Sequence, residues 1–259
     1  MTDAFSNKVA VVTGSSGIGL GCALKLASLG ARVHLCGIDT ELNEKAKQLA
    51  DGLPVSVHHV DVGDEAEVRL FAEAVGTEHS DVHVLLNAAA IQPYGTIETT
   101  EPADWDRVMQ TNLRSCYLTS HFFYPLMKGR SDASIIHVAS VQGHCNQQNV
   151  LAYATTKGAI HALTRAMAVD CAADGVRVNS ISPGSIRTPL LEFAARELTP
   201  AGGNMEETLK GFGSSHPIGR VGTIDEVADL VAFLAGSQSG FCTGSDYAID
   251  GGLRAQVGV

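Results

Sequence analysis

The sequence predicts an α/β fold: one domain built on a doubly wound parallel sheet of about seven strands, with helices on both faces. Short, β-branched apolar runs alternate with longer helical patterns along the whole chain. The early runs lack a clean alternation of apolar and polar residues, as expected for strands that helices bury on both faces. With 259 residues, 45% of them hydrophobic, and no visible repeat or linker, residues 1–259 are predicted to form a single domain.

Each element follows from its local pattern. The expected strands are Lys8–Thr13, Arg32–Cys36, Pro54–Val60, Val82–Leu86, Ser134–Ala139, Arg177–Ile181 and Tyr247–Ile249. The expected helices are Gly17–Leu29, Glu41–Ala50, Glu65–Val75, Pro102–Met127, Ala152–Ala172 and Ile224–Leu234. The stretch 189–217 is rich in proline and glycine, and we expect it to be irregular. It follows a strand end, where open α/β sheets bind ligands, so it is predicted to be a lid over the substrate; the alternative is an ordinary surface excursion.

Composition excludes several classes of partner. The formal charge is −10, so no basic footprint for nucleic acid is present. No apolar run approaches the roughly 18–20 residues that span a membrane, and the first residues do not form a secretion signal. The six cysteines are scattered without a C-x-x-C pair, which predicts a reducing, cytoplasmic location. His58, His59, His137 and His144 show no metal-ligand spacing with acidic residues, so we expect no metal.

A glycine-rich turn follows the first predicted strand and opens the first helix. It comprises Gly14, Ser15, Ser16, Gly17, Ile18 and Gly19. Glycine lets backbone N–H groups approach a pyrophosphate at a helix N-terminus, so this turn predicts a Rossmann-type dinucleotide site. A tight strand–helix turn without a ligand is the alternative.

The second predicted strand is followed by Ile38 and Asp39. A carboxylate at this point accepts hydrogen bonds from the adenosine ribose and repels a 2′-phosphate. No Arg or Lys follows before Lys45, so the sequence favours NAD over NADP. Asp39 could equally serve as the N-cap of the next helix.

Tyr153 and Lys157 lie four residues apart on a predicted helix, which places them on one face. An ammonium ~4 Å from the phenol, at an effective dielectric constant of ~20, would favour the phenolate by about 4 kcal/mol and lower the tyrosine pKa by roughly three units. Tyr153 would then be a general base near neutral pH. Alone, the pair could be an ordinary surface contact, but Ser140 ends a buried strand thirteen residues earlier, where a ligand crevice would open.

Together these motifs resemble the short-chain dehydrogenase/reductase family in its single-domain form, over nearly the whole chain. The residues that carry the resemblance are Thr13–Gly19, Asp61-Val62, Asn87–Ala90, Asn112, Ser140, Tyr153, Lys157, Pro183-Gly184 and Tyr247–Gly252. There are two departures from the family pattern. The glycine turn is one residue shorter than the usual T-G-x-x-x-G-x-G, and Ala88 and Ala90 replace the second Asn and the Gly of the usual N-N-A-G.

The resemblance implies a role for each matching residue. Tyr153 would be the general acid/base, Ser140 would orient the reacting oxygen, Lys157 would bind the nicotinamide ribose, and Asn112 would hold a water that relays protons. Asn112 could instead be a satisfied core amide, and Ser140 a capping hydroxyl. The further implied cofactor contacts are Asp61, Val62, Asn87, Ala88, Ala89, Pro183, Gly184, Ile186 and Thr188.

The predicted activity is hydride transfer between NAD and a secondary alcohol or carbonyl compound. Amide side chains between Ser140 and Tyr153, with Gln142 and Asn149 as substrate contacts, resemble the family's aldose dehydrogenases and suggest a sugar or polyol. The alternatives are an NADPH-dependent ketoreductase and a non-catalytic dinucleotide sensor or scaffold. The resemblance also implies a homo-oligomer, commonly a tetramer, assembled through the helices 102–127 and 152–172.

Overall fold

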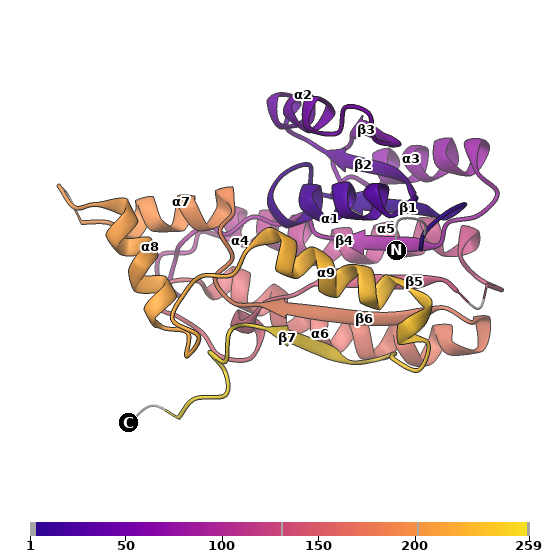
Figure 1. The fold of residues 1–259 in the computed structure, drawn as a ribbon. Helices are drawn as coiled ribbons and strands as arrows, with labels where there is room; N and C mark the ends of the chain where they lie inside the picture. The colour runs from indigo at the N-terminus through magenta and orange to yellow at the C-terminus, as the bar shows by residue number, and fades with distance from the viewer. Residues whose placement is uncertain (1–3, 131, 201, 258–259) are drawn as a thin grey trace.

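The computed structural model describes residues 4–130, 132–200 and 202–257. Within these ranges one seven-stranded parallel sheet has the order β3-β2-β1-β4-β5-β6-β7, which confirms the predicted fold class (Figure 1). The strands are β1 (Val9–Thr13), β2 (Arg32–Gly37), β3 (Val55–His59), β4 (Val84–Asn87), β5 (Ser134–Val138), β6 (Arg177–Pro183) and β7 (Asp246–Ile249). Each predicted strand is present, with boundaries shifted by a few residues.

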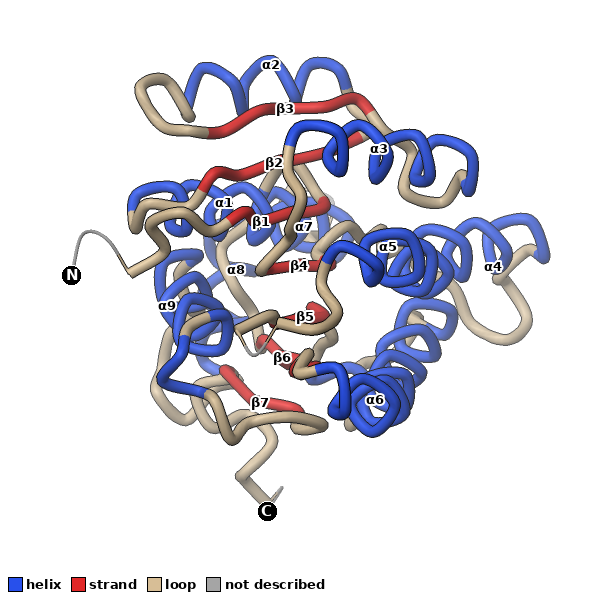
Figure 2. Tube along the Cα trace, turned by 90° about the vertical axis from the view of Figure 1, so that its right-hand side faces the viewer, coloured by secondary structure: helices blue, strands red, loops and turns tan. Residues whose placement is uncertain are grey.

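Helices cover both faces of the sheet (Figure 2). One face carries α1 (Gly17–Ser28) and α9 (Ile224–Ala235), while α2 (Thr40–Leu49) lies along β3. The other face carries α3 (Glu65–Glu78), α5 (Ser115–Phe123) and α6 (Leu151–Cys171). Side chains of β1 alternate between these two layers: Ala10 and Val12 pack toward α1 and α9, and Val9 and Val11 toward α3 and α5.

The predicted long helix Pro102–Met127 is broken into several segments. It consists of α4 (Pro102–Val108), a π-helical turn η1 (Met109–Arg114), α5 and a 3₁₀ turn η2 (Tyr124–Leu126). Pro125 lacks a backbone N–H, which accounts for the tighter last turn. The apolar periodicity is nearly the same through α and π turns, so the sequence pattern does not distinguish them.

The predicted irregular stretch 189–217 is largely helical, which corrects that expectation. Thr188 caps α7 (Pro189–Leu198) by accepting a hydrogen bond from Leu191, and Asn204 caps α8 (Met205–Ser214). The proline starts a helix here because its fixed φ suits the first helical position. Position 201 of the predicted lid lies outside the described residues. Figure 1 shows α7 and α8 projecting beyond one end of the sheet.

None of the described helices combines the length and the apolar character needed to cross a membrane.

The strand order reverses direction between β1 and β4, since β2 and β3 lie on one side of β1 and the later strands on the other. Open α/β sheets bind ligands outside the carboxyl ends of the strands at such a reversal.

Candidate active site

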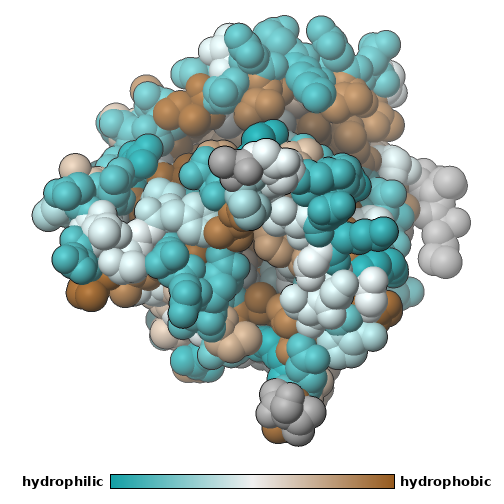
Figure 3. Space-filling model, turned by 90° about the vertical axis from the view of Figure 1, so that its left-hand side faces the viewer, coloured by the Kyte–Doolittle hydropathy of each residue, from teal (hydrophilic) through white to brown (hydrophobic). Residues whose placement is uncertain are grey.

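A cavity of about 840 Å³ lies at this reversal, against the carboxyl ends of the strands. Its wall runs from the glycine turn after β1, past the ends of β2, β4 and β5, to α6 and α7. Figure 3 views this end of the molecule, where the surface is hollowed and apolar side chains are visible between polar ones. The volume is typical of a site for a small organic ligand or cofactor.

The glycine turn forms one end of the cavity. Gly14 and Gly17 have positive φ angles of 94° and 54°, which glycine adopts without strain. Ser16 is the N-cap of α1, yet its side chain makes no capping hydrogen bond among the described residues. The first-turn N–H groups are therefore free of a side-chain partner, as a site for a phosphate requires.

Gly19 does not line the cavity. An added Cβ at Gly19 would lie 2.1 Å from the Gly14 carbonyl oxygen.

The shortened turn packs closely against the end of β2. A Cβ added at Gly37 would lie 2.2 Å from Ser15 Oγ, so the serine fills the space that a side chain at position 37 would need. The first acid therefore comes at Asp39, whose Oδ1 accepts a hydrogen bond from Leu42 at 2.9 Å as the N-cap of α2. Asp39 and Ile38 also line the cavity, so the capping role and the position at the site occur together.

The segment after β4 is held against the turn by Thr13. Its hydroxyl accepts hydrogen bonds from the N–H groups of Ala88 and Ala89, at 3.0 and 3.1 Å. Asn87 is buried behind the wall, where its amide contacts Thr119 and His137. The remaining residues expected at the cofactor all line the cavity: Asp61, Val62, Ala88, Ala89, Pro183, Gly184, Ile186 and Thr188.

Ser140, Tyr153 and Lys157 meet in the cavity wall. Ser140 follows β5, and its Oγ accepts a hydrogen bond from Gln142 at 3.1 Å, so it caps the short 3₁₀ turn η3 (Val141–Gly143). Tyr153 and Lys157 lie one turn apart on α6. Lys157 Nζ donates a 2.7 Å hydrogen bond to the Val138 carbonyl and lies 5.3 Å from the centre of the tyrosine ring.

Burial dominates the titration of this pair. It raises the pKa of Tyr153 to about 12, although the Ser140 hydroxyl acts in the opposite direction. It lowers the pKa of Lys157 to about 8. This differs from the lowered tyrosine pKa predicted from pairing, because losing water around both groups penalises the phenolate and the ammonium alike.

We expect the buried Lys157 to make stability depend on pH. Its folded pKa of about 8 lies below the ordinary value of 10.5, so the unfolded chain binds more protons between these values and stability rises with pH there. Below pH 8, Lys157→Met is expected to be more stable than the parent chain, by on the order of 3 kcal/mol. This difference in unfolding free energy should shrink as pH increases from 8 toward 10. Denaturant unfolding of both proteins at each pH measures the difference. A difference that does not change with pH would contradict the lowered pKa of Lys157.

Asn112 lies behind the wall, in the π-helical turn. It is fully buried; its Oδ1 accepts from the Ile91 N–H at 2.8 Å, and its Nδ2 donates to the Ile91 carbonyl and to Thr156. The amide thus joins η1 to the loop that borders the cavity and to the helix that carries Lys157. These bonds give the side-chain amide partners within the protein, as the core-amide alternative expects.

The expected substrate residues divide into two groups. Gln142 lines the cavity together with Asn146 and Gln147, and the Gln142 side chain accepts a hydrogen bond from the Gln147 N–H at 3.0 Å. Asn149 is exposed and lies outside the wall; its φ of 64° and its carbonyl, which accepts from Gly95, hold the loop that leads into α6.

Asp246, at the start of β7, lies outside the cavity wall but bonds to segments that border it, and the sequence analysis did not single it out. It accepts hydrogen bonds from Ser180 and Ser182 on β6, both at 2.8 Å. His144, beyond η3, lies 2.8 Å from its other oxygen, and His161 of α6 lies 3.5 Å away. The Asp246 carboxylate therefore connects β6 with the loop after Ser140 and with the part of α6 that follows Lys157. No local pattern signals this, since the groups are far apart in the chain.

The cavity fits a nicotinamide dinucleotide on geometric grounds. The glycine turn lies at one end, where the first-turn N–H groups of α1 have no side-chain partner among the described residues, and the Ser140–Tyr153–Lys157 group lies at the other, in one continuous wall. The two groups of His, Cys, Asp or Glu residues that converge closely enough to hold a metal, among the described residues, both lie outside this wall.

Comparison with known proteins identifies the family. Residues 12–254 match the family described as enoyl-(acyl carrier protein) reductase. A cyclohexanol dehydrogenase of Acinetobacter sp. (strain SE19) is 33% identical to this chain, over 99% of this chain and 98% of that protein.

Two solved structures are similar over almost their whole length. Ligand-free aldohexose dehydrogenase of Thermoplasma acidophilum has a TM-score of 0.91 and 32% identity, covering 100% of this chain and 98% of the other. An actinorhodin polyketide ketoreductase variant with NADPH has a TM-score of 0.90 and 28% identity, covering 98% and 99%. This chain therefore belongs to the short-chain dehydrogenase/reductase family, and it is a nicotinamide-dependent oxidoreductase that acts on alcohol or carbonyl groups.

Proposed function

We propose that this enzyme is an NAD-dependent dehydrogenase of secondary alcohols in which Tyr153 is the general acid/base. The observation that carries the proposal is the convergence of Ser140, Tyr153 and Lys157 in the wall of the cavity whose far end is the glycine turn. When bound, the nicotinamide accepts or supplies the hydride. Tyr153 takes the proton from the substrate hydroxyl in the oxidative direction and returns it in the reductive direction.

The neighbouring residues prepare Tyr153 for this role. Ser140 supplies a hydroxyl at the end of β5 that can hold the substrate oxygen and hydrogen-bond the phenolate. Lys157 keeps a positive charge beside the ring, which offsets part of the cost of the buried phenolate. Asn112 acts through position, because its amide joins the π-helical turn to the loop at Ile91 and to Thr156 beside Lys157.

Selection of NAD is proposed to rest on Asp39. Its carboxylate lines the cavity with only one oxygen used by the N-cap in the described residues, and no Arg or Lys lies between Asp39 and Lys45. A 2′-phosphate there would meet a negative charge instead of a cationic partner. The turn and Gly37 fit each other, so the short loop is expected to bind a dinucleotide in its own geometry.

Titration with NADH and with NADPH tests this proposal. The quenching of Trp105, the single tryptophan, or the nicotinamide fluorescence reports binding. We expect NADH to bind at least about tenfold more tightly, equivalent to ~1.4 kcal/mol. Asp39→Ala is the matched variant, and it should reduce the preference. Tighter binding of NADPH by the parent chain would overturn the NAD assignment, and no binding of either would refute the enzymatic proposal.

A hydroxyl-rich substrate, such as a sugar or polyol, is the substrate class that we propose. Gln142, Asn146 and Gln147 offer amide donors and acceptors along one side of the cavity. The similarity to an aldohexose dehydrogenase agrees with this choice.

A ketoreductase that uses NADPH is the second candidate function. It is favoured by the similarity to the NADPH-bound polyketide ketoreductase and by Leu190 and Leu191, which make the α7 side of the wall apolar.

We propose that α7 and α8 form the lid over the substrate, since residues of both helices line the cavity.

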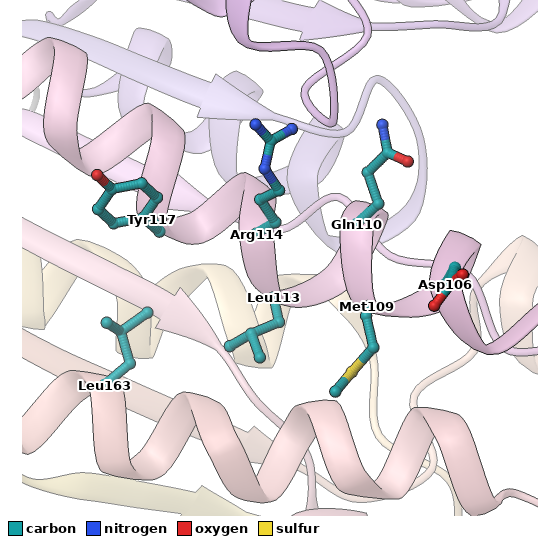
Figure 4. Close-up of a pocket in the computed structure, with 7 residues that line it drawn as sticks. All are labelled: Asp106, Met109, Gln110, Leu113, Arg114, Tyr117 and Leu163. Atoms are coloured by element: carbon teal, nitrogen blue, oxygen red, sulfur yellow. The ribbon is translucent and has the colours of Figure 1, made fainter.

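We also propose self-association into a homotetramer through the outer side of α4, η1, α5 and α6. A second cavity of about 580 Å³ lies on that side (Figure 4). Met109 and Leu113 point toward α6, from which Leu163 points back, and Tyr117 is 53% exposed beside them. Apolar surface of this kind is suited to burial between subunits.

A further inference from the structure

Three histidines and a glutamate gather on the α3 side of the sheet, away from the cofactor cavity. His34 is on β2, His58 on β3, and Glu78 and His79 are at the C-terminal end of α3. None of the four lines the cavity, and none has a role in the proposed reaction. His34 is buried, with 2% of its surface exposed, while His58 and His79 are half-buried and Glu78 is exposed, so the group extends from the interior to the surface.

The ligand atoms of His34, Glu78 and His79 all lie within 4.8 Å of one another. His79 Nε2 is 3.2 Å from Glu78 Oε1, yet it is buried and makes no hydrogen bond among the described residues. Two ligands of a tetrahedral ion with bonds of ~2.0–2.1 Å are separated by about 3.3 Å and point at the ion, not at each other. The distance and the absence of hydrogen-bond alignment both fit that arrangement.

His58 occupies the position of a supporting residue. Its Nε2 lies 3.1 Å from His34 Nδ1, so one ring nitrogen of His34 is held by an imidazole and the other is left for a ligand. A metal-binding histidine is usually oriented through its second ring nitrogen in this way. Phe71 packs on His58, with ring centres 4.9 Å apart, and closes the cluster on its inner side.

The charges around the cluster favour a cation. Glu78 makes no ion pair with Lys or Arg among the described residues, and its side chain is 56% exposed, which gives an ion a path from solvent. The other histidine–carboxylate group, His144, His161 and Asp246, is less suitable. There the carboxylate already accepts hydrogen bonds from two serines, and the Arg254 guanidinium lies 3.7 Å away.

Although the histidine spacing in the sequence led us to expect no metal, we propose that His34, Glu78 and His79 bind one divalent transition-metal ion, with His58 orienting His34. Imidazole nitrogens with one carboxylate suit Zn²⁺, and water from the exposed side of Glu78 can complete four-coordination. The ion would join the end of α3 to β2 beneath it. Because it binds only the folded arrangement of these elements, its expected effect is on stability and not on hydride transfer.

The test is Zn²⁺ binding to the full-length, untagged protein after treatment with a chelator. We expect calorimetry to give one strong site per chain, and excess Zn²⁺ to raise the thermal midpoint by at least about 3 °C. His79→Gln should weaken binding by at least about tenfold and abolish the thermal shift. Dinucleotide binding by this variant is the check that it has folded.

His144→Gln is the matched control, since it makes the same substitution in the other histidine–carboxylate group. We expect it to bind Zn²⁺ as the parent chain does. The proposal is overturned if the parent chain shows no strong site, or if His79→Gln binds as tightly as the parent. It is also overturned if binding is lost in His144→Gln and retained in His79→Gln.

Discussion

Tyr153→Phe is expected to lose turnover by about 10²–10⁴-fold while the enzyme binds dinucleotide with nearly unchanged affinity. The substitution removes only the hydroxyl that exchanges the substrate proton. Tyr153 is only 7% exposed, and its ring lies beside Lys157 on α6, so a phenylalanine ring in the same place should preserve the shape of the wall. Steady-state rates with a responsive alcohol and NADH fluorescence titration measure the two quantities.

Tyr124→Phe is the matched control. It removes a phenol hydroxyl that donates a 2.6 Å hydrogen bond to Asp174, on a segment that does not line the cavity. A loss of about 0.5–1.5 kcal/mol of stability is expected there, with the turnover number unchanged. Turnover retained in Tyr153→Phe would refute Tyr153 as the general acid/base, and an equal loss in both variants would point to a general effect on folding.

Gly19→Ala is expected to have the largest effect on the binding end of the cavity. An added Cβ would lie 2.1 Å from the Gly14 carbonyl oxygen and 2.8 Å from that of Thr13, and both are backbone atoms. The first turn of α1 must therefore move away from β1. We expect a loss of at least ~1–3 kcal/mol of stability from overpacking, and a weakening of NADH binding by more than about tenfold.

Gly211→Ala makes the same chemical change but is expected to increase stability. Gly211 lies in α8, and an added Cβ would meet nothing within 4 Å. Alanine in a helix interior is favoured over glycine, so we expect a gain of roughly 0.5–1 kcal/mol. Denaturant unfolding of both variants and NADH titration of Gly19→Ala are the measurements. Unchanged NADH affinity in Gly19→Ala would show that the turn can adapt to the methyl group.

Local sequence signals were sufficient for the architecture and for a set of residues that line the cavity. Strand–helix alternation predicted the parallel sheet, because runs buried on both faces differ in composition from amphipathic helices. The order of strands then brings the carboxyl ends of β1, β4 and β5 to one edge. For this reason the sequence alone predicts that the glycine turn, Asp39, Ser140 and Tyr153 belong to one site, and residues 14–18 of the turn line one cavity together with the other three.

The same signals were insufficient for the interruption of the helix 102–127 and for the helices in 189–217. Apolar periodicity does not separate a π turn from an α turn, and proline and glycine suggested a loop where Thr188 and Asn204 cap helices. Capping residues identify a helix only when the chain that follows them packs against something, and that depends on contacts with distant segments.

Taken alone, the sequence determined the fold class, the family motifs and the residue types at the proposed reacting centre, because each depends on neighbours within a few positions. Only the tertiary structure decided that Ser15 fills the space beside Gly37, that burial raises the Tyr153 pKa, and that Asp246 joins the segments around the site. It likewise brought His34 and His79 together from separate elements. The physical reason is common to all four: steric exclusion, desolvation and ligand geometry depend on distances in space, which separation along the chain does not specify.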